Sequence, residues 1–229
     1  DMKTEKGYGR GWVLIIYAFL AYFVSSAVGS SMNAASGILA ELRGWNATML
    51  TSLISLGAVA NIAAGLVFGR LAVRYSAKKL SIICCVGWMA VMVGLGLTDN
   101  LWIFSACLVL GTGIANALGY QLSPVMISRW FPKRKGIVMG IVTMGIPLCS
   151  GMATMIYQTG YHAMGSVGGF LPFIMIAAVA LVLLVAFISD RPEDKGFIPD
   201  NGVQVSIKEE QQIKKDSIWT TSKLLRTPQ

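Results

Sequence analysis

The fold of this chain is indicated first by one short stretch, Arg129-Trp130-Phe131-Pro132-Lys133-Arg134-Lys135-Gly136. It places four cations and two aromatic rings between two long apolar runs that carry no charge. Cations and amphipathic rings favour the boundary between a membrane and water. The stretch therefore predicts a short cytoplasmic turn that joins two membrane-spanning helices.

The composition of the whole chain is that of an integral membrane protein. Its 229 residues are 55% hydrophobic and only 13% charged, whereas an ordinary soluble domain has about 25% charged residues. The formal charge of +8 does not indicate nucleic-acid binding, because the basic residues lie in short loops or polar ends and form a solvated ring at the membrane. We expect the lipid bilayer as a partner and no nucleic acid. Since the four cysteines lack metal-ligand spacing, we also expect no metal or cofactor.

Six apolar runs are each about as long as a transmembrane helix. The predicted spans are residues 12–38, 48–69, 80–97, 102–128, 136–158 and 168–189. Residues 1–11 form a polar amino end, and residues 190–229 form a polar segment after the last span. When the spans alternate in direction, every Lys and Arg except Arg43 falls on one side of the membrane. The positive-inside rule then predicts that both ends of the chain are cytoplasmic.

The six spans divide into two groups of three with matching polar patterns. The first and fourth spans carry polar side chains at helical spacing, whereas the third and sixth contain no Asn, Gln or Tyr. A helix with a polar stripe should face neighbours or water, and a helix that is apolar all round should face lipid. These matching roles predict an all-α membrane fold with a three-plus-three inverted repeat, because an odd number of spans reverses the direction of the second group.

Polar stripes on the first and fourth spans predict the lining of a central substrate cavity. The predicted cavity residues are Tyr22, Ser26, Asn33, Asn116, Tyr120 and Gln121. For any single Ser or Thr in a stripe, a hydrogen bond to its own helix backbone is the alternative. The spans contain no Lys or Arg away from their ends, and an isolated charge there costs about 2.5 kcal/mol or more. This chain alone should therefore not bind a carboxylate tightly.

The stretch after the second span resembles the loop between helices two and three of the major facilitator superfamily. It reads Gly69-Arg70-Leu71-Ala72-Val73-Arg74-Tyr75-Ser76-Ala77-Lys78-Lys79. The family pattern Gly-x-Leu-Ala-Asp-Arg-x-Gly-Arg-Lys is matched at Gly69, Leu71, Ala72, Arg74 and Lys78, with Val73 in place of the usual acid. The resemblance implies the amino-terminal six-helix half of a twelve-helix transporter.

The opening stretch, with glycines following at 140 and 145, is similar to the oxalate/formate antiporter and monocarboxylate transporter branch of that superfamily. The branch implies a secondary transporter of small organic anions, mono- or dicarboxylates, that works by alternating access and is not an enzyme. It also implies a carboxy-terminal six-helix half as a partner, a truncated central loop over residues 190–229, and a location in a bacterial inner membrane.

The resemblance assigns expected roles to the two basic loops, and the glycines and proline of the fifth span indicate a further role there. The expected conformational and gating residues are Gly69, Arg70, Arg74, Lys78, Arg129, Trp130, Phe131, Pro132, Arg134 and Gly136. In the fifth span, Gly140, Gly145 and Pro147 are expected to serve helix packing and bending. Small residues let helix backbones approach closely, and proline removes a backbone donor.

Two alternatives stay open at this point. The chain could belong to a major facilitator transporter of another small solute, or it could be a non-transporting, half-sized six-helix scaffold protein. An intramembrane enzyme is disfavoured, because His162 is the only histidine and neither a serine-histidine arrangement nor a cluster of metal ligands lies within the spans.

Overall fold

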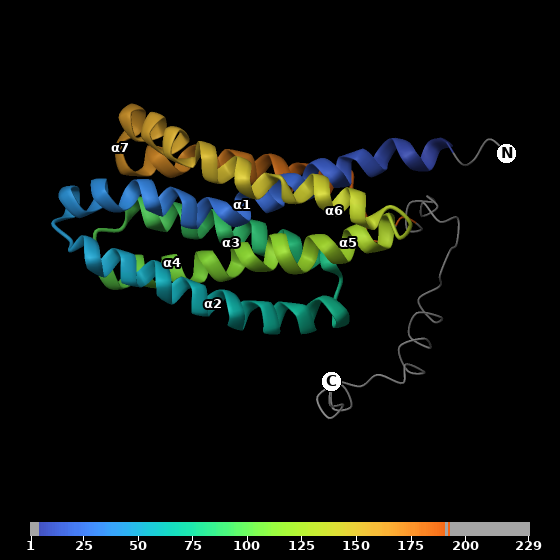
Figure 1. The fold of residues 1–229 in the computed structure, drawn as a ribbon, viewed down its shortest axis with the longest axis horizontal. Coiled ribbons are helices and arrows are strands. Elements are labelled where there is room, and N and C mark those ends of the chain that lie inside the picture. Colours follow the sequence, from blue (N-terminus) through green and yellow to red (C-terminus); the bar gives the residue numbers. More distant parts are fainter. Residues whose placement is uncertain (1–4, 191, 193–229) are drawn as a thin grey trace, which may run out of the picture.

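The computed structural model describes residues 5–190 and Pro192, and within this part the elements form an elongated bundle of helices (Figure 1). The prediction of an all-helical fold is confirmed. The elements are α1 (Glu5–Arg43), α2 (Ala47–Arg74), α3 (Ala77–Leu97), α4 (Leu101–Asn116), the π-helix η1 (Ala117–Leu122), α5 (Ser123–Trp130), α6 (Lys135–Thr143) and α7 (Gly145–Ala186). The predicted polar segment 190–229 lies outside the described residues, apart from Asp190 and Pro192.

Within the described residues, five helical stretches are long and apolar enough to cross a membrane. They are Gly11–Asn33, Thr48–Ala72, Ala77–Leu97, Leu101–Trp130 and Lys135–Ala186. The last has 52 residues, which is far more than the roughly 20 that one crossing needs. It is folded back on itself at a break inside α7, so the bundle has six apolar helical arms (Figure 1).

The fold-back in α7 lies at Met164 and Gly165, whose backbone is not helical. Gly165 has φ +71° and ψ −153°, a combination that is essentially restricted to glycine. The two arms approach so closely that a Cβ on Gly160 would overlap the backbone of Gly168. The connection expected over residues 159–167 is therefore much shorter, because glycines permit a tight turn that hydropathy does not reveal.

Prolines account for two other irregularities. Pro124 has no N–H, and its ring would meet the carbonyl of the preceding turn. The chain adapts by forming η1 just before it, and the Ser123 N–H bonds to the Leu118 carbonyl five residues earlier. Likewise, α6 ends at Thr143 and α7 begins at Gly145, two residues before Pro147, and the Met144 N–H between them bonds to the Ile141 carbonyl three residues earlier.

Short polar loops join the other helices. Asn46, Ser76 and Asn100 each precede a helix and accept a hydrogen bond from an N–H in its first turn. Such caps satisfy donors that a helix leaves unpaired at its amino end. They explain how loops of only a few residues can reverse the chain.

The packing places α1 at the centre of the bundle. It lies against α7, α6, α4 and η1, while α2 packs mainly on α4, and α3 packs on α4 and α7. The interior is filled by large side chains that include Tyr17, Trp88, Phe104, Tyr157 and Phe173. The outward faces of the helices carry exposed Ile, Leu, Val and Met side chains, as expected for a surface that contacts lipid.

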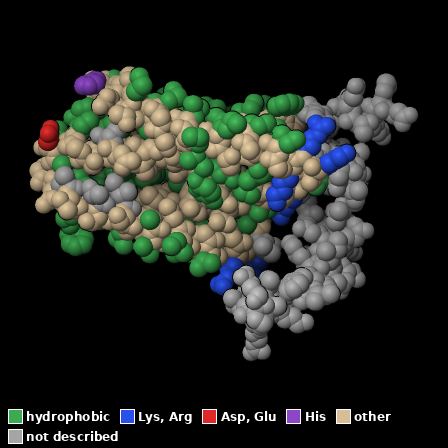
Figure 2. Space-filling model, viewed as in Figure 1, with side chains coloured by type: hydrophobic (Ala, Val, Ile, Leu, Met, Phe, Trp, Pro, Cys, Tyr) green, Lys and Arg blue, Asp and Glu red, His purple; other side chains and the backbone are tan. Residues whose placement is uncertain are grey.

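Charged side chains gather at the two ends of the bundle (Figure 2). One end, here named the basic end, holds the α2–α3 loop, the α5–α6 loop and the residues that follow α7. Its described Lys and Arg residues are Arg70, Arg74, Lys78, Lys79, Arg129, Lys133, Arg134 and Lys135. The opposite end holds the α1–α2 loop, the α3–α4 loop and the turn in α7, together with Arg43 and Asp99.

Candidate functional site

An open polar hollow of about 330 Å³ lies near the middle of α1, α2 and α4. Its volume falls within the usual range for small-molecule sites, roughly 300–1,000 Å³. We name it the central hollow. It is lined by Ser25, Ser26, Gly29, Ser30 and Asn33 of α1, by Gly57, Ala58 and Asn61 of α2, by Thr112 and Asn116 of α4, and by Tyr120 of η1.

Three serine hydroxyls form a triangle beside the central hollow. Ser26 and Ser30 lie one turn apart on α1, with their Oγ atoms 3.1 Å from each other. Ser150 Oγ, from α7, lies 3.2 Å from each of them. Gly145 helps to bring α7 this close, because a Cβ there would overlap the backbone of α1 at Phe19. The triangle offers three hydroxyl groups that can each donate or accept a hydrogen bond.

Tyr120 forms the other side of the hollow and is held by Tyr22. The two rings meet edge to face, with centroids 5.4 Å apart. Tyr22 is only 2% exposed, whereas Tyr120 is 45% exposed. Tyr120 lies within η1, and π-helical segments often occur at functional sites because they redirect the side chains that they carry. Tyr22 therefore supports the hollow from behind, while Tyr120 faces it.

Four of the six predicted cavity residues line the same hollow. These are Ser26, Asn33, Asn116 and Tyr120. Gln121 does not join them: its side-chain amide lies against Gly65 and Gly69 of α2. It follows Tyr120 directly, and neighbouring residues on a helix point in different directions.

The predicted packing role of Gly140 is not matched inside the described part of this chain, and its neighbour one turn earlier, the predicted gating residue Gly136, is equally open. The positions where Gly136 and Gly140 would carry a Cβ are open space, with no described atom within 4 Å. Gly145, in contrast, is buried against α1. The even spacing of small residues indicated a packing face but could not show which members would have a neighbour.

Several polar residues at the hollow were not predicted to belong to it. Thr112 Oγ1 donates to the Val109 carbonyl at 2.9 Å and lies 3.4 Å from the Gly57 carbonyl of α2. The gaps of four from Thr112 to Asn116 to Tyr120 were the available signal. Ser150 belongs to a polar stripe of the fifth span with Thr143, Thr154 and Gln158, but only tertiary packing shows that it meets α1.

The lining of the central hollow carries no formal charge among the described residues. Hydroxyl and amide groups can donate hydrogen bonds to an oxyanion or accept them from a hydroxylated solute. The described part of the chain also holds no group of His, Cys, Asp and Glu side chains arranged to bind a metal ion. The hollow is therefore suited to recognition by hydrogen bonding.

The basic end is tied together by Asp190, which the sequence assigned only to the start of the polar segment. Its Oδ2 lies 3.0 Å from Arg129 Nη1, and its Oδ1 accepts from the Lys78 backbone N–H at 3.0 Å. Lys78 Nζ also donates to the Val185 carbonyl, and Trp130 Nε1 donates to the Ser189 carbonyl, both at 3.3 Å. Asp190 thus joins the amino end of α3, the end of α5 and the residues after α7.

The predicted gating residues fall into two structural groups. Lys78, Arg129, Trp130 and Phe131 take part in the contacts that hold this end, and the two aromatic rings are only 5% and 7% exposed. The remaining members of the two loops are partly or fully exposed. Arg70 and Arg74, with Gly69, line a shallow hollow at the end of α2, while Pro132, Arg134 and Gly136 lie on the α5–α6 side.

The opposite end is tied together by Arg43, whose side chain is 5% exposed. Its guanidinium donates to the carbonyls of Leu95 at 3.5 Å and Gly96 at 3.0 Å, and to Ser166 Oγ at 3.2 Å. It also lies over the rings of Trp45 and Phe104. The Asp99 carboxylate is 3.2 Å from Arg43 Nε but 88% exposed, and the pair lacks hydrogen-bond geometry.

Comparison with known proteins identifies the family of this chain. Residues 18–227 match the family model of the Major Facilitator Superfamily. The phosphoglycerate transporter protein of Salmonella typhimurium is 30% identical over 134 residues, which are 58% of this chain and 29% of that protein. The MFS-type transporter pytF of Aspergillus terreus is 25% identical over 194 residues, which are 80% of this chain and 64% of that protein.

The chain therefore spans less than two thirds of the length of either curated relative. The family match nevertheless covers most of it and agrees with the apolar helices of the bundle. Proteins of this family are transporters and not enzymes. This multi-pass membrane chain belongs to the major facilitator superfamily.

Proposed function

We propose that this chain forms the amino-terminal half of a secondary transporter of small organic anions, mono- or dicarboxylates, that works by alternating access. The observation that carries the proposal is the central hollow, a cluster of hydroxyl and amide groups at mid-length in helices whose outer faces are apolar. Polar side chains at that depth are costly unless they serve a solute or its path. The resemblance of the Arg129–Gly136 loop to carboxylate transporters supports the choice of substrate.

The hollow would contribute hydrogen bonds, not charge. Ser26, Ser30 and Ser150 present their hydroxyls together, and a carboxylate oxygen can accept from such donors. Because the described lining holds no cation, the proposal places the compensating positive charge on a carboxy-terminal six-helix half that closes the hollow. The name of one relative, a phosphoglycerate transporter, denotes a carboxylate-bearing anion and fits this substrate class.

The proposal includes an inverted repeat of three plus three helices. Two packing pairs support it, because α2 lies on α4 while the first arm of α7 lies on α1. The repeat relates the first span to the fourth and the second span to the fifth. It therefore turns the contact between the second and fourth spans into a contact between the fifth and first spans, and both contacts are present. We also propose that the basic end faces the cytoplasm, with both chain ends there, and that the membrane is a bacterial inner membrane.

A second candidate substrate is an uncharged, hydroxylated solute. The specific observation in its favour is the absence of formal charge from the described lining of the hollow. A neutral solute would need no cation from another half. This candidate also stays within the superfamily, since fold alone does not decide the substrate.

The test is uptake by the complete gene product that contains this chain, reconstituted into proteoliposomes. Radiolabelled oxalate, formate, lactate and 3-phosphoglycerate would be compared with a neutral polyol and with protein-free vesicles. Exchange of at least one carboxylate, inhibited by unlabelled carboxylates, is the expected result. Uptake of the polyol alone would replace the substrate assignment, and uptake of no solute would favour a scaffold role.

A further inference from the structure

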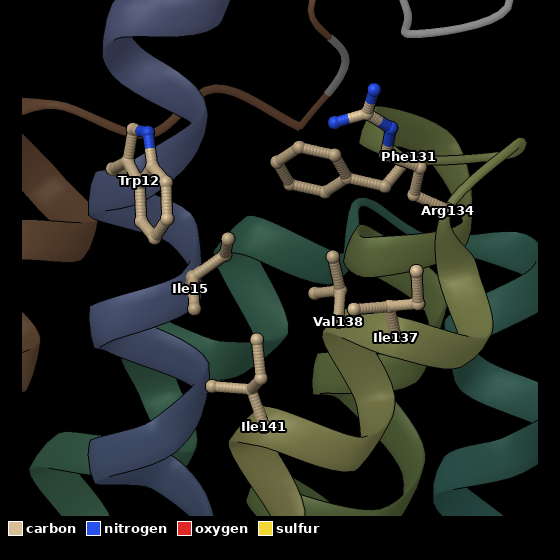
Figure 3. Close-up of a pocket in the computed structure, with 7 residues that line it drawn as sticks. All are labelled: Trp12, Ile15, Phe131, Arg134, Ile137, Val138 and Ile141. Atoms are coloured by element: carbon tan, nitrogen blue, oxygen red, sulfur yellow. The ribbon is translucent and has the colours of Figure 1, made fainter.

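Two sides of α1 differ in polarity near the basic end. On one side, an apolar hollow of about 110 Å³ is lined by Trp12 and Ile15 of α1 and by α6 side chains such as Ile137 (Figure 3). Tyr17 follows Ile15 by two residues, and two residues turn a helix by about 200°. Its side chain therefore points away from that hollow and into the bundle, where it is fully buried.

Three fully buried hydroxyl groups meet at Tyr17. Ser81 lies one turn into α3, Ser123 begins α5 directly after η1, and both are 0% exposed, as is Tyr17. The Tyr17 hydroxyl lies near both serine hydroxyls, but neither contact has hydrogen-bond geometry. Among the described residues, the Tyr17 and Ser81 oxygens have no hydrogen-bond partner. We name these three residues the buried hydroxyl cluster.

Ser81 differs from several other serines of the bundle. A serine inside a helix can donate to a carbonyl three or four residues earlier in that helix. The serines that do so here include Ser25, Ser31, Ser105 and Ser128. Ser81 makes no such bond, although it is buried. Its hydroxyl is therefore available to a partner outside its own helix.

The protons of the three hydroxyl groups limit what can join them. Ser123 Oγ donates to the Leu118 carbonyl at 2.8 Å, so it can only accept a further hydrogen bond. Tyr17 and Ser81 each carry a proton that needs an acceptor. A cation would meet those two protons, and an anion would leave Ser123 without a donor. Water can accept from Tyr17 and Ser81 and donate to Ser123, so it suits all three groups.

Other contacts hold the helices of the cluster in place, so the hydroxyl groups are not free to move together. Asp190 accepts from the Lys78 N–H, about one turn before Ser81 on α3. Gly119 of η1 lies so close to α1 that a Cβ there would overlap the Ser25 side chain. Because unpaired buried hydroxyl groups are costly, a small polar molecule between them is favoured.

We propose that the buried hydroxyl cluster binds one water molecule, which joins α1 and α3 to the start of α5. Buried water satisfies otherwise unpaired polar groups in this way, typically through two to four hydrogen bonds. Since Ser123 also bonds to the Leu118 carbonyl, the water links α1 and α3 to η1, which carries Tyr120 of the central hollow. This chain alone encloses the cluster, so the inference depends neither on the proposed substrate nor on a carboxy-terminal half.

The first test is X-ray hydroxyl-radical footprinting of the purified full-length gene product in lipid nanodiscs. Radiolysis of a bound water produces a hydroxyl radical that oxidises the neighbouring side chain, and mass spectrometry locates the oxidised residue. We expect oxidation of Tyr17 but not of Met92, which is equally buried on α3 and whose thioether is easily oxidised. An unmodified Tyr17 would mean that the hydroxyl groups bond directly and would overturn the proposal. Oxidation of both residues would mean general entry of water and would also overturn it.

A second test removes one partner of the water. Ser81→Ala should weaken binding of the water about fivefold, the effect of one lost hydrogen bond, and so reduce the oxidation of Tyr17. Ser31→Ala is the matched control, because Ser31 is also 0% exposed but donates to the Val28 carbonyl of its own helix at 3.2 Å. With circular dichroism unchanged for both variants, only Ser81→Ala should lower the oxidation of Tyr17. Equal changes in the two variants, or no change in Ser81→Ala, would refute the site.

Discussion

The two ends of α3 are held by single charged side chains of opposite sign. At its amino end, the Asp190 carboxylate accepts from the Lys78 N–H. At its carboxyl end, the Arg43 guanidinium donates to the Leu95 and Gly96 carbonyls. A helix carries partial positive charge at its first N–H groups and partial negative charge at its last carbonyls. Asp190 and Arg43, named here the two clasps of α3, therefore each carry the charge that their end of the helix favours.

The clasps differ in burial and in reach. Arg43 is 5% exposed and joins α1 to α3, to the rings of Trp45 and Phe104, and to the turn in α7. Asp190 is 22% exposed and has two partners, Arg129 and the α3 backbone. We therefore expect Arg43 to contribute more to the stability of the bundle than Asp190 does. Between the ends, Ser26, Ser30 and Ser150 contact one another through their hydroxyls, and we expect these partly exposed contacts to contribute less to stability than either charged residue.

The largest effect is expected from breaking the buried clasp. Arg43→Met should lower the free energy of unfolding by about 3 kcal/mol, because it leaves the carbonyls at the end of α3 without their donor. The measurement is unfolding by sodium dodecyl sulfate in mixed micelles. The control is Asp99→Asn, which should cost no more than about 0.5 kcal/mol, since an exposed partner adds little. Equal losses would contradict the comparison.

A smaller effect is expected at the turn that positions Ser166 beside Arg43. Gly165→Ala should cost about 2 kcal/mol, because a Cβ disfavours the backbone conformation found there. The matched control is Gly151→Ala on the same helix, where the added Cβ meets open space. That variant should be neutral or slightly stabilising, because alanine favours helix more than glycine does. The same unfolding assay measures both, and similar losses would show that the turn is unstrained.

At the basic end, Asp190→Asn should cost about 1 kcal/mol. The amide oxygen can still accept from the Lys78 N–H, but the charge-assisted bond with Arg129 is lost. A double-mutant cycle with Arg129→Gln should return a coupling energy of about 1 kcal/mol. A coupling energy near zero would mean that Asp190 acts only as a cap for α3. A loss as large as that of Arg43→Met would remove the difference between the two ends.

The smallest effect on stability is expected in the central hollow. Ser150→Ala should change the free energy of unfolding by less than about 0.5 kcal/mol, while the KM for substrate uptake rises about fivefold through one lost hydrogen bond. Ser105→Ala is the control, because the Ser105 hydroxyl bonds to the Leu101 carbonyl of its own helix at 2.6 Å. An unchanged KM in Ser150→Ala would remove the serine triangle from the proposed site.

The apolar arms and most of the hollow could be predicted without coordinates. Span length follows from hydropathy, and the spacing of Asn33, Asn116 and Tyr120 follows from the period of a helix. The prediction that Gln121 lines the hollow does not match the structure. Gln121 is next to Tyr120 in the sequence, but a helix turns about 100° per residue, so the two side chains point in different directions. For Gly140 the spacing of small residues predicts a packing face, and the described part of the chain holds no neighbour for it.

The sequence by itself determined where the chain could cross a membrane and which helix faces were polar, because both follow from side chains that are close together along the chain. Only the tertiary structure decided that Ser150 meets Ser26 and that Asp190 meets Arg129. These pairs are 124 and 61 residues apart. Such contacts depend on how whole helices pack, on the tight turn at Gly165 and on the breaks before Pro124 and Pro147. Glycine and proline mark the turn and the breaks locally, but no local pattern of residues encodes which distant side chains they bring together.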